Sequence, residues 1–529
     1  MTAALALFGF VPFAARRLLT YLHLFQQEEY DTGRFARWII ANRACDRRLS
    51  LALLALFAAQ LILEQRTPAW LFPALAGAAF LGAAAIEGDP RRRAKKPLAM
   101  TARARRIYAT ALALAVLLGV AAALAGPLVI GWLVAVQLVP AALLAANLSL
   151  APLEARVQRR YWQDAHDKLQ RLAPTVIAVT GSYGKTSVKH ILGHVLETAA
   201  PTLITPGSVN TAMGIARIIR ERMQPHHRYF VVEMGAYGIG SIARLCALTP
   251  PSLGIVTAIG KAHYERFKSL DAVAQAKFEL AEAACNNGGT VVVAADTLQF
   301  AVPRAFVARH SGAVVKVGCD EDADLGIATL SQEAEGVRAI VRWRGSEYEL
   351  RAPLYGLHQG RNIALAFAAA ATIGVAPDDI VAALKSTPQI AHRLEVRRQP
   401  DGTVLIDDAY NSNPVGFASA LALLDTLRPN DGRRILVTPG MVELGSAHEA
   451  EHATIGRLAA AHADILVAVA PRRAAPLAAA FAAAAPARQI VLCATFAEAQ
   501  AWLDRNLKPR DVVLIENDLP DLLEQPPRL

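Results

Sequence analysis

Residues 172–187 read LAPTVIAVTGSYGKTS, and this stretch decides the fold of the larger part of the chain. The apolar run Val176–Val179 predicts a buried parallel strand. It leads directly into a glycine-rich turn, after which apolar residues recur at helical spacing from Val188 to Leu196. A strand, a glycine-rich turn and a helix in this order are the context of a phosphate-binding loop. We therefore predict that a P-loop domain begins here.

The residues of this turn are suited to binding nucleotide phosphates. Gly181 and Gly184 let backbone N–H groups approach phosphate oxygens closely, because glycine has no side chain. Lys185 adds a positive charge for the β- and γ-phosphates, and the Thr186 hydroxyl is a ligand for Mg²⁺. The spacing departs from the general form GxxxxGK[ST], since Val179 stands where the first glycine belongs. The loop residues predicted to bind ATP are Gly181, Ser182, Gly184, Lys185, Thr186 and Ser187.

The composition excludes a disordered chain and indicates membrane segments. Of 529 residues, 54% are hydrophobic and 19% are charged, whereas about 25% charged residues are typical of a soluble domain. The five cysteines form no CxxC pair, which disfavours a zinc ribbon or a disulfide framework. The net charge of +10 lies in residues 1–170, because the remainder carries equal numbers of basic and acidic residues. Positive charge beside apolar runs favours a membrane surface, and the neutral remainder has no basic stripe for nucleic acid.

Four apolar stretches within residues 1–150 predict transmembrane helices. None contains a charged side chain, and their lengths are near the roughly 20 residues that a helix needs to cross a bilayer. Residues 1–26 are also apolar but contain Arg16 and Arg17, which favours a helix lying in the membrane interface. A fifth span is the alternative for that segment. The four predicted spans are Leu49–Leu63, Ala69–Ile86, Ile107–Gly126 and Pro127–Leu150.

Basic residues beside these stretches predict their orientation. They cluster before the first span and between the second and third, whereas the other loops carry one basic residue or none. The positive-inside rule places the two rich flanks in the cytoplasm, and four crossings then return the chain to the cytoplasm after Leu150. We therefore predict a multi-pass protein of the inner (cytoplasmic) membrane, in contact with the lipid bilayer and with cytoplasmic catalytic domains. The basic residues are Arg34, Arg37, Arg43, Arg47, Arg48, Arg91, Arg92, Arg93, Lys95, Lys96, Arg103, Arg105 and Arg106.

The chain is thus predicted to be an α-helical membrane region followed by α/β domains. The predicted parts are the membrane region 1–150, a linker 151–171, a central P-loop ATPase domain 172–390 and a C-terminal domain 391–529. In the last part, apolar runs such as RILVTPG and DVVLIE alternate with helical segments, which predicts a Rossmann-like parallel sheet. The alanine-rich residues 474–487 predict a helix, because alanine is the best helix former.

The phosphate loop and six further motifs resemble those of the Mur ligases. VTGSYGKTS (179–187) is similar to the TGTxGKTS-like loop of that family, and the resemblance extends over residues 172–450. The EMG and DDAYNSNP segments look most like the branch that adds D-alanyl-D-alanine. The further matches are TPGSVNTAMGIA (205–216), VVEMGAYGIGSIARL (231–245), AIGKAHYERFKSLDAVAQAKFEL (258–280), GLHQGRN (356–362), LIDDAYNSNPVG (405–416) and PGMVELG (439–445).

The resemblance implies ATP-driven amide formation in the assembly of a cell-envelope precursor. A carboxylate takes the γ-phosphoryl group to become an acyl phosphate, an amine attacks, and phosphate leaves. The implied partners are small-molecule amine and carboxylate substrates, soluble or lipid-linked, with D-Ala-D-Ala addition to a muramoyl peptide as the leading case. The alternatives are a membrane-associated poly-amino-acid (polyglutamate-type) ligase and a catalytically silent Mur-like scaffold.

The resemblance also implies a Mg²⁺ site and a catalytic set. Glu233 ends the apolar run YFVVE, where a carboxylate near a phosphate loop is well placed for Mg²⁺. His263 resembles a ligand of a second metal ion in the family. Lys277 matches the lysine that Mur ligases carbamylate, a reaction that requires a neutral amine and yields an anion. The implied metal ligands are therefore Thr186, Glu233, His263 and carbamylated Lys277, and the implied catalytic residues are Lys185, Glu233, His263 and Lys277.

Residues farther along the chain match nucleotide-binding positions of the family. Asn362 matches an asparagine that contacts adenine, and Arg393 looks like the arginine at the domain junction that reaches the nucleotide phosphates. Asp407, Tyr410 and Asn411 lie in the matching loop of the last domain, and they complete the ATP site if that domain closes onto it.

Two departures from the family concern substrate recognition. The predicted membrane region occupies the place of the usual UDP-sugar-binding domain. The Lys-Gly-Ser stretch after the last strand is replaced by Glu516, Asn517 and Asp518. The resemblance therefore supports the type of reaction more strongly than the identity of the substrates.

Overall fold

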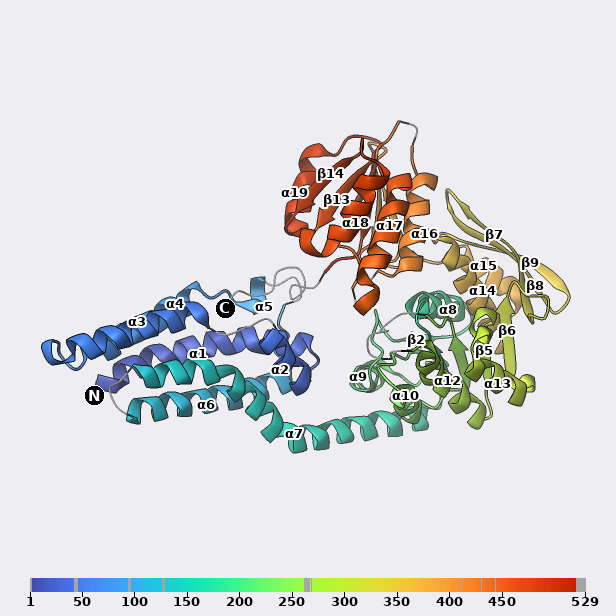
Figure 1. The fold of residues 1–529 in the computed structure, drawn as a ribbon. Coiled ribbons are helices and arrows are strands. Elements are labelled where there is room, and N and C mark those ends of the chain that lie inside the picture. Colours follow the sequence, from blue (N-terminus) through green and yellow to red (C-terminus); the bar gives the residue numbers. More distant parts are fainter. Residues whose placement is uncertain are drawn as a thin grey trace. The chain divides into compact units, whose positions relative to one another are not determined.

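The structure is a computed structural model that describes residues 2–41, 46–93, 97–125, 129–260, 267, 269–410, 412–429, 431–442 and 444–519. The chain forms two compact units, one built mainly from residues up to 158 and one from residues 159–518 (Figure 1).

The first unit is helical. Helix α1 (Thr2–Gln27) packs along α4 (Leu71–Ile86) and α6 (Ala102–Leu124) (Figure 1). Phe10 lies with its ring centroid 5.4 Å from that of Phe80 and 5.5 Å from that of Trp132. A Cβ atom on Gly9 would lie 2.2 Å from the carbonyl oxygen of Gly77, so the two backbones cross too closely for a larger residue. The helices are α1 (Thr2–Gln27), α2 (Thr32–Ala41), α3 (Arg47–Leu63), α4 (Leu71–Ile86), α5 (Pro90–Arg93), α6 (Ala102–Leu124) and the first part of α7 (Ile130–Leu172).

Three helices of the described residues are long and apolar enough to cross a membrane, by length and composition: residues 4–27 of α1, then α6 and α7. α3 and α4, which cover the first two predicted spans, are shorter, with 17 and 16 residues. Residues 1–26, expected as a helix in the membrane interface with a fifth span as the alternative, form the 26-residue helix α1, which packs within this unit. Arg17 pairs with Asp46 at 3.0 Å and with Glu87 at 3.1 Å, so acidic partners neutralise a charge that was expected at the headgroups. The stretch 151–171, predicted as a linker, continues α7 as helix.

A nine-stranded mixed sheet forms the central part of the second unit, in the order β2-β3-β1-β4-β5-β6-β7-β8-β9. The strands from β2 to β7 run parallel to their neighbours, and β7, β8 and β9 are antiparallel. The strands are β1 (Thr175–Thr180), β2 (Thr202–Ile204), β3 (Tyr229–Glu233), β4 (Leu253–Val256), β5 (Thr290–Ala294), β6 (Val314–Gly318), β7 (Leu325–Glu333), β8 (Gly336–Trp343) and β9 (Ser346–Ala352).

Helices cover both faces of this sheet, because successive residues of a strand point to opposite sides. Ile177 and Val179 of β1 pack with α8 and α14, whereas Val176 and Ala178 pack with α9, α10 and α12. The helices of this part are α8 (Lys185–Ala199), α9 (Ala212–Arg222), α10 (Ser241–Leu248), α12 (Leu270–Asn286), α13 (Ala301–Arg309), α14 (Leu357–Thr372) and α15 (Pro377–Leu384).

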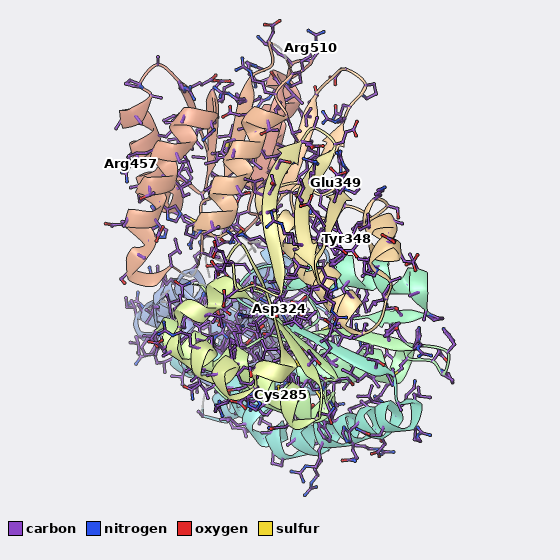
Figure 2. All side chains as sticks on the ribbon, turned by 90° about the vertical axis from the view of Figure 1, so that its right-hand side faces the viewer. Cys285, Asp324, Tyr348, Glu349, Arg457 and Arg510 are labelled. Carbon is purple, nitrogen blue, oxygen red and sulfur yellow. The ribbon has the colours of Figure 1, made fainter. Side chains whose placement is uncertain are left out.

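The antiparallel end of the sheet shows the same alternation. Tyr348 of β9 packs on Phe367, with ring centroids 5.4 Å apart. The neighbouring Glu349 faces the other way and accepts hydrogen bonds from Arg338 and Arg351 (Figure 2). This three-stranded extension was not expected from the sequence.

A six-stranded sheet forms the C-terminal part, in the order β10-β11-β15-β12-β13-β14. All pairs are parallel except β10 with β11, so this sheet too is mixed rather than wholly parallel as predicted. One face packs on α16, α17 and α18, and the other on α19 (Figure 1). The elements are β10 (Glu395–Arg398), β11 (Val404–Asp408), β12 (Arg434–Thr438), β13 (Ile465–Val469), β14 (Gln489–Cys493), β15 (Val512–Glu516), α16 (Pro414–Thr426), α17 (His448–His462), α18 (Pro471–Ala484) and α19 (Phe496–Asn506).

Candidate functional site

The glycine-rich turn joins β1 to α8 at the predicted position. Gly181 and Gly184 have φ angles of 153° and 79°, which side chains rarely tolerate. A Cβ atom on Gly181 would lie 2.0 Å from Oγ1 of Thr257, and one on Gly184 would lie 2.6 Å from Oδ1 of Asn362. Both glycines are therefore required by the backbone conformation and by the close approach of neighbouring side chains.

The lysine of the turn folds back over its own loop. Nζ of Lys185 donates to the carbonyl oxygens of Gly181 at 2.7 Å and Ser182 at 3.3 Å. Burial lowers the pKa of Lys185, and the negative charge of Glu233 opposes that shift. A nucleotide phosphate would offer this ammonium a stronger acceptor than two neutral carbonyls, because hydrogen bonds between charged groups are stronger.

Two predicted metal ligands lie together at the ends of α8 and β3. The Thr186 hydroxyl donates to Oε2 of Glu233 at 2.9 Å, although the residues are 47 positions apart. Asn210 donates to Oε1 of the same carboxylate at 3.2 Å, and Lys189 lies 3.3 Å from Oε2. A hydroxyl and a carboxylate are the hard oxygen donors that Mg²⁺ prefers, so these two residues fit the ion. Neither Lys189 nor Asn210 was predicted from the sequence, although Lys189 follows Lys185 by one helical turn.

Lys277 is buried in α12, with 3% of its surface exposed. Burial holds its pKa well below the ordinary value, and the positive charge of Lys185 acts in the same direction. A lysine in such surroundings is favoured in its neutral form, which is the form that reacts with CO₂. The carbamate at Lys277 stays a prediction.

Two predicted site residues, His263 and Asn411, lie outside the described residues. Asn362 is described and buried, and its Nδ2 donates to Oε1 of Gln359 at 2.8 Å. Its Oδ1 faces Gly184, so the predicted adenine contact and the phosphate turn are neighbours.

The predicted residues of the C-terminal part gather around Arg393. The guanidinium group of Arg393 lies 4.1 Å from the ring centroid of Tyr410, whose hydroxyl hydrogen-bonds that of Ser208 in the central part. Asp407 accepts from Nδ1 of His392 at 2.9 Å. His392 has a φ angle of 59°, a left-handed conformation that is uncommon for a residue with a side chain and occurs often at functional sites.

His392, Asp407 and Glu395 also offer ligand atoms within 4.8 Å of one another. Glu395 already accepts two hydrogen bonds from Arg397 at 3.0 Å, so its charge is balanced within the protein.

Two carboxyl groups meet at the strand ends where the chain departs from the family. Asp408 of β11 and Glu516 of β15 are register partners in adjacent parallel strands, and both are buried. Ser412 donates to Oε1 of Glu516, and the backbone N–H of Leu394 donates to Asp408 at 3.2 Å. Burial raises the pKa of Asp408 to about 6 and holds that of Glu516 well above its usual range, and the two carboxyl groups act on each other. Two adjacent buried acids favour the state in which one of them keeps its proton, because two like charges at this distance repel each other.

This pair predicts a pH dependence of stability. A carboxyl group whose pKa is raised by folding binds its proton more tightly in the folded state, so stability falls as pH rises from about 4 through about 6 and beyond. We expect Glu516→Gln to be more stable than the parent protein by about 1–3 kcal/mol at pH 7.5, with the difference disappearing towards pH 4. The measurement is the midpoint of thermal unfolding against pH, with the exposed Glu321→Gln as control. A gain that is largest at pH 4 would contradict the assignment.

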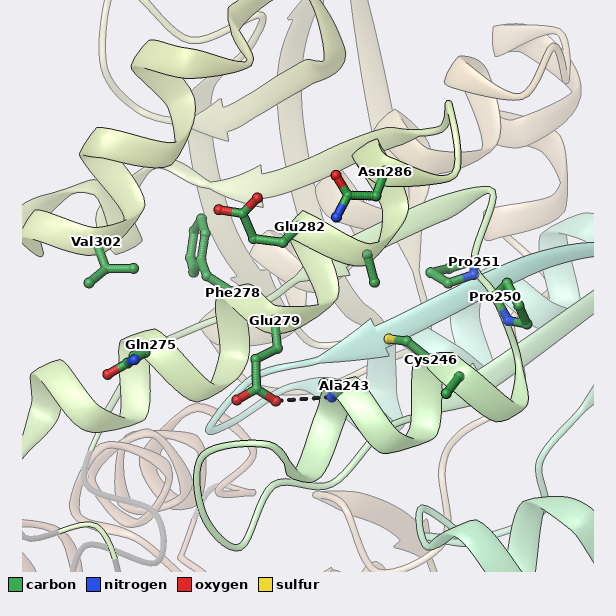
Figure 3. Close-up of a pocket in the computed structure, with 12 residues that line it drawn as sticks. Ala243, Cys246, Pro250, Pro251, Gln275, Phe278, Glu279, Glu282, Asn286 and Val302 are labelled. Atoms are coloured by element: carbon green, nitrogen blue, oxygen red, sulfur yellow. Dashed lines mark hydrogen bonds between the residues drawn. The ribbon is translucent and has the colours of Figure 1, made fainter. Parts of the chain in front are cut away.

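A separate groove of about 780 Å³ lies between α10 and α12 (Figure 3). Phe278, Cys246 and Pro250 line it, and none of the predicted site residues does. Glu279 at its edge accepts hydrogen bonds from the first backbone N–H groups of α10, including Ala243 at 2.9 Å (Figure 3). This contact caps α10 and fixes α12, the helix whose other face carries Lys277.

The central and C-terminal parts of the second unit each match a known protein family. The Mur ligase middle domain matches residues 179–370, and the Mur ligase, glutamate ligase domain matches residues 392–516. The UDP-N-acetylmuramoyl-tripeptide–D-alanyl-D-alanine ligase of Mycobacterium bovis is 35% identical over 290 residues, which is 54% of this chain and 56% of the relative. The Escherichia coli enzyme of that name is 32% identical over 299 residues, covering 55% and 63%. The chain therefore spans little more than half the length of these curated relatives.

Solved structures agree with this assignment. MurF from Acinetobacter baumannii matches with a TM-score of 0.59 and 26% identity, covering 68% of this chain and 77% of that one. The MurF ligase of Thermotoga maritima in complex with ADP matches with a TM-score of 0.59 and 25% identity, covering 68% and 80%. With its middle and C-terminal domains at residues 179–370 and 392–516, the chain belongs to the Mur ligase family.

Proposed function

We propose that the protein is an ATP-dependent ligase that joins an amine to a carboxylate through an acyl phosphate. The observation that carries the proposal is the approach of Thr186 to Glu233, with Lys185 and Lys277 close enough for their charges to act on each other. This arrangement supplies an oxygen-lined cation site beside a phosphate-binding turn. The relatives' names describe a ligase of UDP-N-acetylmuramoyl-tripeptide and D-alanyl-D-alanine, so these are the first substrates to test.

In this proposal, different residues bind the phosphates, the Mg²⁺ ion and the base of ATP. Lys185 and the backbone of the turn hold the β- and γ-phosphates, and Thr186 and Glu233 would hold Mg²⁺ together with His263 and carbamylated Lys277. Mg²⁺ supplies charge neutralisation for the transferring phosphoryl group. Asn362 holds the base beside the turn. Arg393, Asp407, Tyr410 and Asn411 close over the nucleotide from the C-terminal domain, which keeps water from the acyl phosphate.

The helices of the first unit support membrane anchoring as part of the same proposal. Three of them have the length and apolar composition of spans. In this proposal the basic flanks of the sequence and the ligase domains both face the cytoplasm. An anchored ligase would act on a lipid-linked carboxylate or pass its product to membrane enzymes.

Two measurements test anchoring and activity. For anchoring, we expect to recover the protein in carbonate-washed membranes. For activity, we expect the detergent-purified protein to release ADP only when UDP-N-acetylmuramoyl-tripeptide, D-Ala-D-Ala and Mg²⁺ are all present. Lys185→Ala should lower this rate at least about 100-fold, because it removes a charge that acts on the transferring phosphoryl group. Mass spectrometry identifies the ligated product. Recovery in the soluble fraction would contradict anchoring, and bound ATP without a ligated product would contradict this pair of substrates.

A further inference from the structure

Lys189 is a buried lysine that no motif of the sequence analysis assigns. It lies on α8 one helical turn beyond Lys185, and its side chain is completely buried. Lysine is almost never fully buried unless its charge is paired, so its contacts identify what it does.

The first contact is an ion pair with the carboxylate placed at the cation site. Nζ of Lys189 lies 3.3 Å from Oε2 of Glu233, and the side chains are 0% and 1% exposed. Thr186 donates to the same oxygen, while Asn210 donates to Oε1. Three donors, two from α8 and one from the loop before α9, therefore fix the rotation of one carboxylate, and Lys189 is the charged one.

The second contact is with the loop after β2, residues 205–211. Nζ of Lys189 also donates to the carbonyl oxygen of Gly207. The same loop carries Asn210, and it carries Ser208, whose hydroxyl bonds that of Tyr410 from the C-terminal domain. The Lys189 ammonium group thus contacts both the Glu233 carboxylate and the 205–211 loop, which in turn contacts Tyr410 of the C-terminal domain.

We propose that Lys189 is a positioning residue that holds the Glu233 carboxylate and the 205–211 loop in a fixed relative position. The carboxylate at the proposed cation site and Ser208, which bonds Tyr410, are thereby positioned by the same ammonium group. The proposal rests on the proposed ligase function, in which Glu233 binds Mg²⁺ and Tyr410 belongs to the closing domain. Lys189 itself does not touch the reacting atoms in this scheme.

Lys189→Met tests the proposal in the full-length, detergent-purified protein. We expect backbone amides of residues 207–211 to exchange hydrogen for deuterium at least about tenfold faster, because the loop loses its charged tie. We expect the Kd for ADP to change less than about threefold, since the phosphate turn is intact. The kcat per ADP-binding site at saturating Mg²⁺ should fall at least about tenfold, a loss typical of misplaced catalytic geometry. Lys385→Met, at an exposed lysine, is the matched control and should change none of these values.

A second variant covers the case in which Lys189→Met does not fold because it leaves Glu233 buried without its counter-charge. Lys189→Met combined with Glu233→Gln removes both charges, and its loop should still exchange faster than that of Glu233→Gln alone. Unchanged loop exchange in these variants would overturn the proposal. An unchanged kcat per ADP-binding site in Lys189→Met would also overturn the proposal, because the Lys189–Glu233 ion pair would then contribute only to stability. Loop exchange and ADP binding need no acceptor substrate, so they test Lys189 even if the proposed ligase reaction is not found.

Discussion

Lys277→Ala is expected to lower amine-dependent ADP release at least about 100-fold, as large a loss as that expected for Lys185→Ala. The buried amine has its pKa held well below the ordinary value by desolvation and by Lys185, so its neutral form is more accessible than that of an exposed lysine. A neutral amine adds CO₂ through a new N–C bond and releases a proton to solvent, which leaves a carbamate anion that would join Glu233 at the cation site. An ammonium group at this position would instead repel Mg²⁺.

The chemistry of the carbamate separates it from a structural role of the lysine. Lys277→Arg keeps a long cationic side chain but cannot be carbamylated, so it should be as inactive as Lys277→Ala. Acetate or formate should restore part of the activity of Lys277→Ala by supplying the missing carboxylate. Protein labelled with ¹³CO₂ should show a carbamate NMR signal that Lys277→Ala lacks. Gln275→Ala, on the exposed face of the same helix, is the control. An active Lys277→Arg variant would rule out the carbamate.

Gly181→Ala is expected to disrupt the phosphate turn. The new methyl group would lie 2.0 Å from Oγ1 of Thr257 and 3.0 Å from the backbone nitrogen of Ala258, at a φ angle of 153°. The Thr257 hydroxyl cannot simply move aside, because it donates to the carbonyl oxygens of Thr180 and Tyr183. Overpacking of this kind costs about 1–3 kcal/mol, and the unfavourable φ adds about 1 kcal/mol or more.

The expected result is an ADP affinity at least about tenfold lower, because the backbone N–H groups that face the phosphates are displaced. Isothermal titration with ADP and Mg²⁺ measures it. Gly312→Ala, where the added Cβ meets no atom within 4 Å, should stay within about 0.5 kcal/mol of the parent protein in stability and bind ADP normally. Normal ADP binding by Gly181→Ala would show that nucleotide is bound elsewhere.

Local sequence patterns predicted the elements that depend on neighbouring residues. The run TVIAVT followed by GSYGKTS gave a strand, a turn and a helix, because buried apolar runs, glycine positions and helical periodicity are properties of adjacent residues. The alanine-rich stretch likewise forms α18. Glu233 ends β3 and Lys277 lies in the middle of α12, and comparison of the chain with known proteins confirmed the family that the motifs resemble.

Contacts between segments that are far apart along the chain were not predicted from the sequence. The pairing of Arg17 with Asp46 and Glu87 was not predicted, because these acidic residues lie far from Arg17 along the chain. The three-stranded extension β7–β9 was missed, since its pairing is decided between strands rather than within one. Lys189 and Asn210 were missed because a polar residue on a helix or in a loop carries no signal of what it will touch.

By itself, the sequence determined the strand, the glycine-rich turn and the helix at residues 175–199, and the family, because each depends on side chains that are close along the chain. Only the tertiary structure decided that Thr186, Lys189 and Asn210 converge on one carboxylate, and that Asp408 meets Glu516 across two parallel strands. Those contacts join residues far apart in sequence. They form because strand register and helix packing bring the residues together, and burial then makes each unpaired charge too costly to leave without a partner.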